Sequence, residues 1–179
     1  MKKDVIINGQ NNKYLMKKVV NKDFKEPKPK KKIDDSIFYN DEFTQKLPEI
    51  INDLIEDRSN IKQHQFKSAI IKNIKCKING YKNQDYKKKI YDEDNFVSLQ
   101  NVLCLLKDQN LNCYYCNEEC LLFYQFVREN KQWTLDRIDN QIGHITNNVI
   151  LSCLHCNLKR KNTNKDKFFQ ASNLTIIKL

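Results

Sequence analysis

Apolar residues recur at helical spacing through the middle of the chain. Residues 44–58 place them three and four positions apart, which predicts an amphipathic helix. Pro48 falls in the first turn of that helix, where proline is tolerated. The same spacing predicts a second helix from Ile61 to about Gly80 and a third over 95–107, capped by Asp94 or a neighbour. Together these helices could bury a small core or pack against the rest of the chain.

The pattern changes in the last third of the sequence. Residues 133–139 alternate between apolar and polar side chains, which predicts a strand. A loop over 140–147 and a second strand over 148–153 follow, and helical spacing returns from Leu154 to about Ala171. Residues 120–127 are apolar and aromatic, and we interpret them as a further extended segment. The predicted order from residue 133 onward is strand, loop, strand, helix.

Charge adds a candidate partner. The 179-residue chain has a formal net charge of +10, which favours nucleic acid, although A/T-rich coding also enriches lysine, asparagine and isoleucine. Residues 1–32 contain eleven lysines and three acidic residues. We therefore interpret residues 1–43 as a flexible basic arm, which either contacts phosphates, carries a nuclear-type address or is only a solvated tail. Residues 80–94 interleave tyrosines with lysines, and we interpret them as a polar connector, with a base-stacking surface as the alternative.

The sequence has neither an apolar run of about 18 residues, as a membrane span requires, nor an apolar core of signal-peptide length near its start. We therefore expect an intracellular protein, cytoplasmic or nuclear, that is not secreted. In a reducing compartment the seven cysteines favour thiols and metal ligands over disulfides. Their odd number and the missing signal disfavour a disulfide-rich secreted domain.

Two Cys-x-x-Cys pairs carry the strongest chemical signal: Cys113 with Cys116, and Cys153 with Cys156. Each pair presents two thiolates from one turn, so two pairs complete a tetrahedral zinc site with Zn–S distances of about 2.3 Å. The metal itself displaces the thiol protons. The separation of the pairs is wider than in a compact zinc ribbon, so a substructure must lie between them. We predict a structural zinc here, with Cys120 as an alternative to Cys116.

Further motifs lie between the pairs and directly after them. They are LDRIDN at residues 135–140, Gly143-His144, Asn148-Val149, and Asn157 next to Cys156. In this order, the motifs resemble the zinc-bearing branch of the HNH, or ββα-metal, endonucleases over residues 110–170. The resemblance implies a zinc-stabilised ββα-metal module at 111–179, and with the helical region predicted at 44–110 the expected fold is α+β. It also implies metal-dependent hydrolysis of DNA phosphodiester bonds.

The resemblance also assigns roles to individual residues. In that family the zinc is structural, and a separate divalent ion, usually Mg²⁺, serves the chemistry. Asp136 and Asn157 match its ligands, and both offer hard oxygen donors that leave positions for water and phosphate. Asn148 matches an asparagine that braces the loop of the general base. Four basic residues of the last helix are expected to contact DNA through its phosphates: Lys159, Arg160, Lys161 and Lys165.

One position departs from the family pattern. Where members usually carry a histidine that acts as general base, this chain has Arg137, and a guanidinium does not lose its proton in proteins. Three outcomes are open: Arg137 clamps the phosphate while another group takes the proton, His144 acts as the base, or catalysis is lost. In the last case the module is a catalytically inactive HNH-like zinc module that binds nucleic acid or protein.

Overall fold

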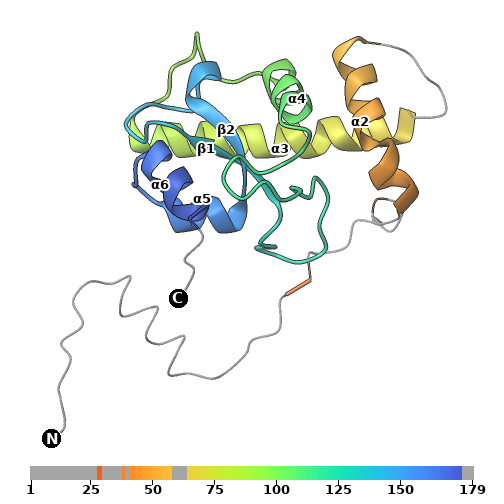
Figure 1. Cartoon of the computed structure of the whole chain (residues 1–179). Coiled ribbons are helices and arrows are strands. Elements are labelled where there is room, and N and C mark those ends of the chain that lie inside the picture. The colour runs from red at the N-terminus through yellow and green to blue at the C-terminus, as the bar shows by residue number, and fades with distance from the viewer. Residues whose placement is uncertain (1–27, 30–37, 39–40, 58–63, 175–179) are drawn as a thin grey trace, which may run out of the picture.

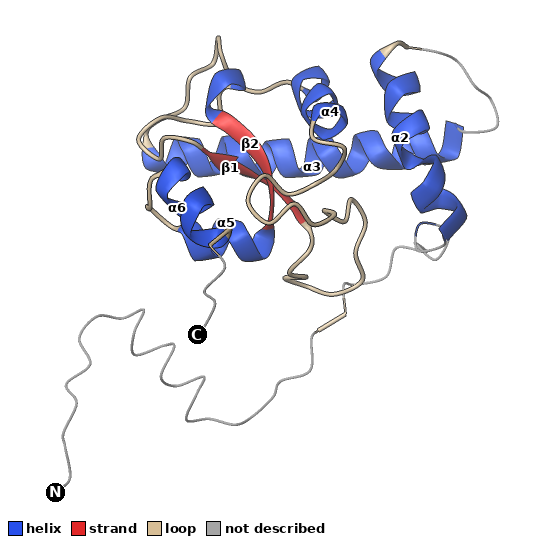
Figure 2. Cartoon of the chain, in the orientation of Figure 1, coloured by secondary structure: helices blue, strands red, loops and turns tan. Residues whose placement is uncertain are grey.

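The computed structural model describes residues 28–29, 38, 41–57 and 64–174. Its elements in chain order are α2 (Asp41–Ile55), α3 (His64–Lys88), α4 (Leu99–Asp108), β1 (Trp133–Arg137), β2 (Val149–Cys153), α5 (Leu154–Arg160) and α6 (Lys165–Ser172). The fold of the described residues is α+β, as predicted (Figures 1 and 2). Helices come first, and a β-hairpin and helix follow beside a four-cysteine cluster, which is consistent with a ββα zinc module.

The β-hairpin forms the centre of the molecule. Strands β1 and β2 pair antiparallel, with Trp133 opposite Cys153 at one end and Arg137 opposite Val149 at the other. Every residue of both strands is buried. Helix α3 lies beside β1, where the Leu135 backbone amide, on the edge away from β2, donates to the hydroxyl of Tyr81 at 2.9 Å, and α5 packs against both strands.

The helices and the hairpin share one hydrophobic core. Helix α2 packs on α4, and α4 in turn contacts β2. One buried cluster contains a side chain from each of α2, α4, β1 and β2, and each of these is at most 2% exposed: Ile50, Leu106, Leu135 and Leu151. The helical region before residue 110 and the hairpin after it therefore pack their apolar side chains into the same core. Among the described residues, no helix has the length and apolar character needed to cross a membrane.

All three helices predicted before residue 110 have different limits, and the third, α4, spans Leu99–Asp108 rather than 95–107. Helix α3 continues through Gly80 to Lys88, and the predicted start near Ile61 lies outside the described residues. A glycine in a helix costs about 1 kcal/mol relative to alanine, and here the buried Tyr81 and Asp85 dock the following turns onto the rest of the protein. Helix α2 begins at Asp41, so Pro48 lies inside it rather than in its first turn.

The C-terminal half also differs in detail. Residues 120–127 form no strand and pair only through isolated bridges, such as Leu121 with Gln132. The predicted helix over 154–171 is two helices, because Lys161 has a φ of 54° and ends α5, and Asn164 caps the start of α6. The cap of α4 is Ser98 rather than Asp94. Most of the predicted basic arm lies outside the described residues.

Candidate functional site

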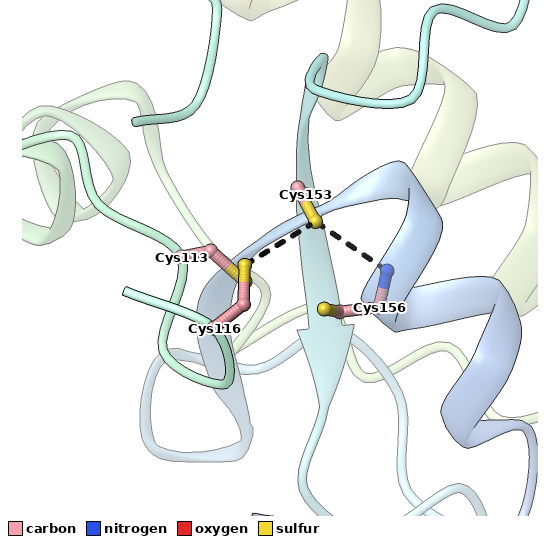
Figure 3. Close-up of side chains that lie close together, drawn as sticks. All are labelled: Cys113, Cys116, Cys153 and Cys156. Carbon is pink, nitrogen blue, oxygen red and sulfur yellow. Dashed lines mark hydrogen bonds between the residues drawn. The ribbon is translucent and has the colours of Figure 1, made fainter. Parts of the chain in front are cut away.

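The four predicted cysteines converge on one point. The sulfur atoms of Cys113, Cys116, Cys153 and Cys156 all lie within 4.8 Å of one another, and Figure 3 shows the four thiols facing each other. A tetrahedral zinc with Zn–S bonds of about 2.3 Å separates its sulfurs by about 3.8 Å, close to the 4.0 Å between Cys116 and Cys153. We call this group the cysteine cluster; its donors and spacing fit a structural Zn²⁺. Cys120 is buried outside it.

The local structure of each Cys-x-x-Cys pair explains how the cluster forms. Cys153 ends β2 and caps α5, accepting a hydrogen bond on its sulfur from the Cys156 amide at 3.4 Å. The first pair lies on a tight turn in which Asn117, with a φ of 56°, donates its amide to the Cys113 carbonyl at 2.9 Å. The Tyr114 amide donates to the Leu151 carbonyl of β2, so this turn is tied to the hairpin. A metal held here would therefore join the turn, β2 and α5.

Electrostatics inside the cysteine cluster favour a cation. Burial, together with the negative charge of the nearby Cys113 thiolate, raises the pKa of the Cys156 thiol to about 12. A hydrogen bond from Cys120, and a smaller effect of one from Cys153, lower the pKa of the Cys113 thiol. The four sulfurs therefore do not all ionise at neutral pH on their own, and a divalent cation must displace the remaining protons. Metal affinity is expected to fall as the pH is lowered.

A second feature is a cleft beside strand β1. This cleft of about 790 Å³ opens between α3, β1 and α5. Four of the residues that the motifs singled out line it: Asp136, Arg137, His144 and Asn157. Four cations also border it, whereas Asp136 is its one acidic lining residue; the cations are Lys77, Lys88, Arg137 and Lys161. The cleft therefore combines hard oxygen donors, an imidazole and a net positive lining.

Asp136 is held by two neighbours. Its carboxylate is buried, and the Arg160 guanidinium of α5 binds both of its oxygens, Nε to Oδ2 at 2.6 Å and Nη2 to Oδ1 at 2.9 Å. The Tyr115 hydroxyl donates to Oδ2 at 2.8 Å, and burial, with the nearby Asp136 charge, raises the pKa of Tyr115, so it remains a donor. Each carboxylate oxygen has about two acceptor sites. Oδ2 is thus filled, while Oδ1 has one site left.

Asn157 lies one turn before Arg160 on α5. Its Nδ2 donates to the Thr134 hydroxyl at 3.0 Å and to the Leu135 carbonyl at 3.4 Å. These bonds fix the amide plane and leave the carbonyl oxygen as its acceptor. Both Asn157 and Arg160 reach the face of β1 that carries Thr134 and Asp136. Asp136 and Asn157 therefore lie on the same side of the hairpin and border the same cleft.

Arg137 and Asn148 shape the loop between the strands. Arg137 Nη1 donates to the carbonyls of Asn140 at 3.2 Å and Ile142 at 3.1 Å, and no carboxylate among the described residues pairs with its guanidinium. Asn148 donates Nδ2 to three carbonyls of the same loop, including that of Gly143 at 3.0 Å, and accepts the Asp139 amide at 2.8 Å. These four hydrogen bonds hold the loop that carries His144.

His144 is anchored by a residue that the sequence analysis placed in a polar connector. Asp85 of α3 is completely buried and contacts His144 twice, at the backbone amide at 2.6 Å and at ring Nδ1 at 2.8 Å. Burial lowers the pKa of His144, and Asp85 partly offsets this effect. The imidazole is therefore neutral at pH 7. Tyr81, four residues before Asp85, stacks on the ring with centroids 4.5 Å apart.

The predicted phosphate-contacting residues fall in different places. Lys159 is exposed, and Lys161 borders the cleft. Lys165 is partly buried, lies over the Tyr114 ring and pairs with Asp166 at 3.6 Å. Arg160 is 1% exposed and bound to Asp136, so its guanidinium does not lie on the surface where a DNA backbone would pass.

Sequence reasoning missed three side chains that position the site: Tyr81, Asp85 and Tyr115. Tyr81 and Asp85 are four residues apart and so lie on one face of α3. This spacing would have been visible if the predicted helix had extended beyond Gly80. Tyr115 is one of the two residues between Cys113 and Cys116, and nothing in the sequence pattern there indicates a contact with Asp136.

Comparison with known proteins adds no assignment. A scan against protein-family models finds no matching family, and searches of curated proteins and of solved structures find no significant match.

Proposed function

We propose that this protein is a metal-dependent endonuclease of the HNH type that hydrolyses DNA phosphodiester bonds. The observation that carries the proposal is the cleft: Asp136, Arg137, His144 and Asn157 come from a strand, a loop and a helix, yet all four line it. A carboxylate, an amide oxygen, an imidazole and a guanidinium together supply what phosphodiester hydrolysis requires. The cysteine cluster supports the proposal because it joins β2 to α5, the helix that carries Asn157.

The cleft suits a polyanion. Lys88, Arg137 and Lys161 line it, and the chain as a whole has a formal net charge of +10. Nη1 of Arg137 already binds the loop, which orients the guanidinium and leaves its other N–H groups for a phosphate oxygen. Exposed Lys159 adds a sequence-independent contact to the DNA backbone. Binding through these cations is expected to weaken as salt concentration rises.

Asp136 and Asn157 would hold the divalent ion. Oδ1 of Asp136 keeps one acceptor site, and the Asn157 carbonyl oxygen is not used by the bonds that fix its amide group. Two hard oxygen donors match the small number of protein ligands that Mg²⁺ takes, with water and phosphate oxygens in the remaining positions. When bound, such an ion would neutralise charge that develops on the phosphate and on the departing oxygen.

His144 is the proton acceptor in this scheme. Its neutral imidazole takes a proton from a water molecule as the water oxygen forms a new bond to phosphorus. The bond from phosphorus to the leaving sugar oxygen breaks, and that oxygen takes a proton from solvent. Arg137 stays charged throughout and stabilises the added negative charge of the transition state.

A second candidate is a non-catalytic module that binds nucleic acid. One observation favours it: Arg160 engages both oxygens of Asp136 and Tyr115 engages one of them, so a cation would share a carboxylate that already has three donors. In that case the cationic cleft binds the phosphate backbone and no bond is broken.

Incubation of supercoiled plasmid with the zinc-loaded protein separates the two functions. We expect nicked or linear DNA with Mg²⁺ or Mn²⁺ and none with EDTA. Asp136→Asn and His144→Ala should abolish cleavage, whereas Asp139→Asn should retain it because Asp139 is exposed and outside the cleft. Binding without cleavage in either metal would favour the second candidate. An Asp136→Asn protein as fast as wild type would exclude the proposed metal site.

A further inference from the structure

A carboxylate far from the hairpin in sequence is built into the environment of His144. Asp85 lies on the last part of α3 and is completely buried. Its Oδ2 accepts the His144 backbone amide at 2.6 Å and its Oδ1 lies 2.8 Å from Nδ1 of the same residue. An ionised carboxylate only accepts hydrogen bonds, so Nδ1 carries the proton in this contact. The opposite ring nitrogen, Nε2, is then unprotonated and able to accept one.

The surroundings hold this arrangement from several directions. Tyr81 stacks on the imidazole, and the His144 carbonyl accepts the Val97 amide at 2.9 Å. Gly143 allows the loop to approach α3, because a Cβ there would lie 2.5 Å from the Ile90 carbonyl oxygen and 2.9 Å from Asp85 Oδ2. These contacts fix the plane of the imidazole, the nitrogen that carries the proton and the backbone of His144.

We infer that Asp85 is the positioning carboxylate of His144: it selects the tautomer protonated on Nδ1 and orients Nε2 to take the proton of the attacking water. The inference rests on the proposed nuclease function for the use of that nitrogen. One hydrogen bond to the backbone amide would be enough to anchor the loop. The hydrogen bond from ring Nδ1 to Asp85 has a further effect, because it keeps the proton on Nδ1 and leaves Nε2 unprotonated, as a proton acceptor requires.

The charges around the ring determine the expected pH dependence. Lys88 of α3 and Arg137 of β1 favour the neutral ring, burial acts in the same direction, and Asp85 opposes them by raising the pKa of His144. Tyr81 is the other titratable group against the ring, and burial raises its pKa, so it stays neutral. Loss of the Asp85 charge should therefore lower the pKa of His144.

The kinetic test compares Asp85→Asn with wild type on plasmid DNA from pH 5 to 9 in Mg²⁺. General-base catalysis contributes about 10²-fold or more, so we expect Asp85→Asn to lose about 10²-fold in rate. The acid limb of its pH–rate profile should also move to lower pH, because that limb follows the pKa of His144. The matched control is Asp94→Asn, an exposed carboxylate before α4, which should change neither quantity. An unchanged rate, or a slower rate with an unmoved limb, would overturn the inference.

A nitrogen NMR titration of the imidazoles tests the same pair without any cleavage. The chain has three histidines, so a His144→Ala spectrum identifies the His144 signals. We expect a neutral ring protonated on Nδ1 in wild type, and a lower pKa in Asp85→Asn. A ring protonated on Nε2, or an equal pKa in both proteins, would refute the pairing even if the enzyme is active. If wild type shows the expected spectrum but cleaves no DNA, the proposed nuclease function fails and the role in catalysis fails with it.

Discussion

Removal of the buried Arg160 side chain should strongly destabilise the protein. Its guanidinium binds both oxygens of Asp136, and it also donates to the Thr163 carbonyl at 2.7 Å and to the Arg137 carbonyl. Arg160→Ala leaves the buried Asp136 carboxylate with Tyr115 as its remaining donor among the described residues. Breaking a buried ion pair from one side costs about 3–5 kcal/mol.

The expected loss lies at the lower end of that range. Asp136 borders the cleft, so water can reach the carboxylate once the guanidinium is gone. A loss of about 3 kcal/mol corresponds to a drop in Tm of roughly 6–12 °C for a chain of this size. Urea unfolding of the zinc-loaded protein, followed by the fluorescence of its single, fully buried tryptophan, Trp133, measures the change in unfolding free energy.

Two variants complete this experiment. Lys159→Ala removes an exposed cation from the same helix and should stay within about 0.5 kcal/mol of wild type. Arg160→Lys keeps the charge but cannot reproduce the two-pronged contact, so it should fall between wild type and Arg160→Ala. If Arg160→Ala unfolds at the same urea concentration as wild type, the buried pair does not exist in solution.

Three further predictions follow from other contacts. Metal analysis should find about one zinc per chain, lost in Cys156→Ser and retained in Cys120→Ser; equal zinc content in both variants would contradict the assigned ligand set. Gly143→Ala should destabilise the protein by about 1–3 kcal/mol because its Cβ would meet the Ile90 carbonyl oxygen at 2.5 Å, and unchanged urea unfolding would argue against that close approach. Burial holds the pKa of His144 below its ordinary 6.5, so the unfolded chain binds this proton more readily and stability should fall as the pH drops below about 6.5. His144→Gln should lose less stability than wild type between pH 7 and pH 5, and equal losses would contradict the lowered pKa.

Local sequence patterns predicted the hairpin and the cysteine cluster well. Alternation over residues 133–139 anticipated β1, because successive side chains of a strand point to opposite faces, and the second strand predicted over 148–153 matches β2. The Cys-x-x-Cys spacing is itself local geometry, so the sequence alone indicated which four cysteines lie together.

Contacts between distant segments could not be read in the same way. The partner of Asp85 lies 59 residues away, and Gly80 suggested a helix end just before the turns that carry Tyr81 and Asp85. Arg160 sits in a run of basic residues that suggested DNA contact, but its burial depends on a carboxylate 24 residues earlier. Residues 120–127 have the composition of a strand, yet Phe123 packs against the rings of Phe38 and Phe43 instead of extending the sheet. In each case tertiary packing outweighed local preference.

The central claim is that Asp136 and Asn157 share a hard divalent cation in the cleft. Electron paramagnetic resonance of Mn²⁺ titrated into zinc-loaded protein measures this binding directly, in wild type and in Asp136→Asn, Asn157→Ala and Asp139→Asn. We predict one Mn²⁺ site in wild type and in Asp139→Asn that is lost or strongly weakened in the other two variants. Equal Mn²⁺ binding by all four proteins, or no binding by wild type, would contradict this prediction.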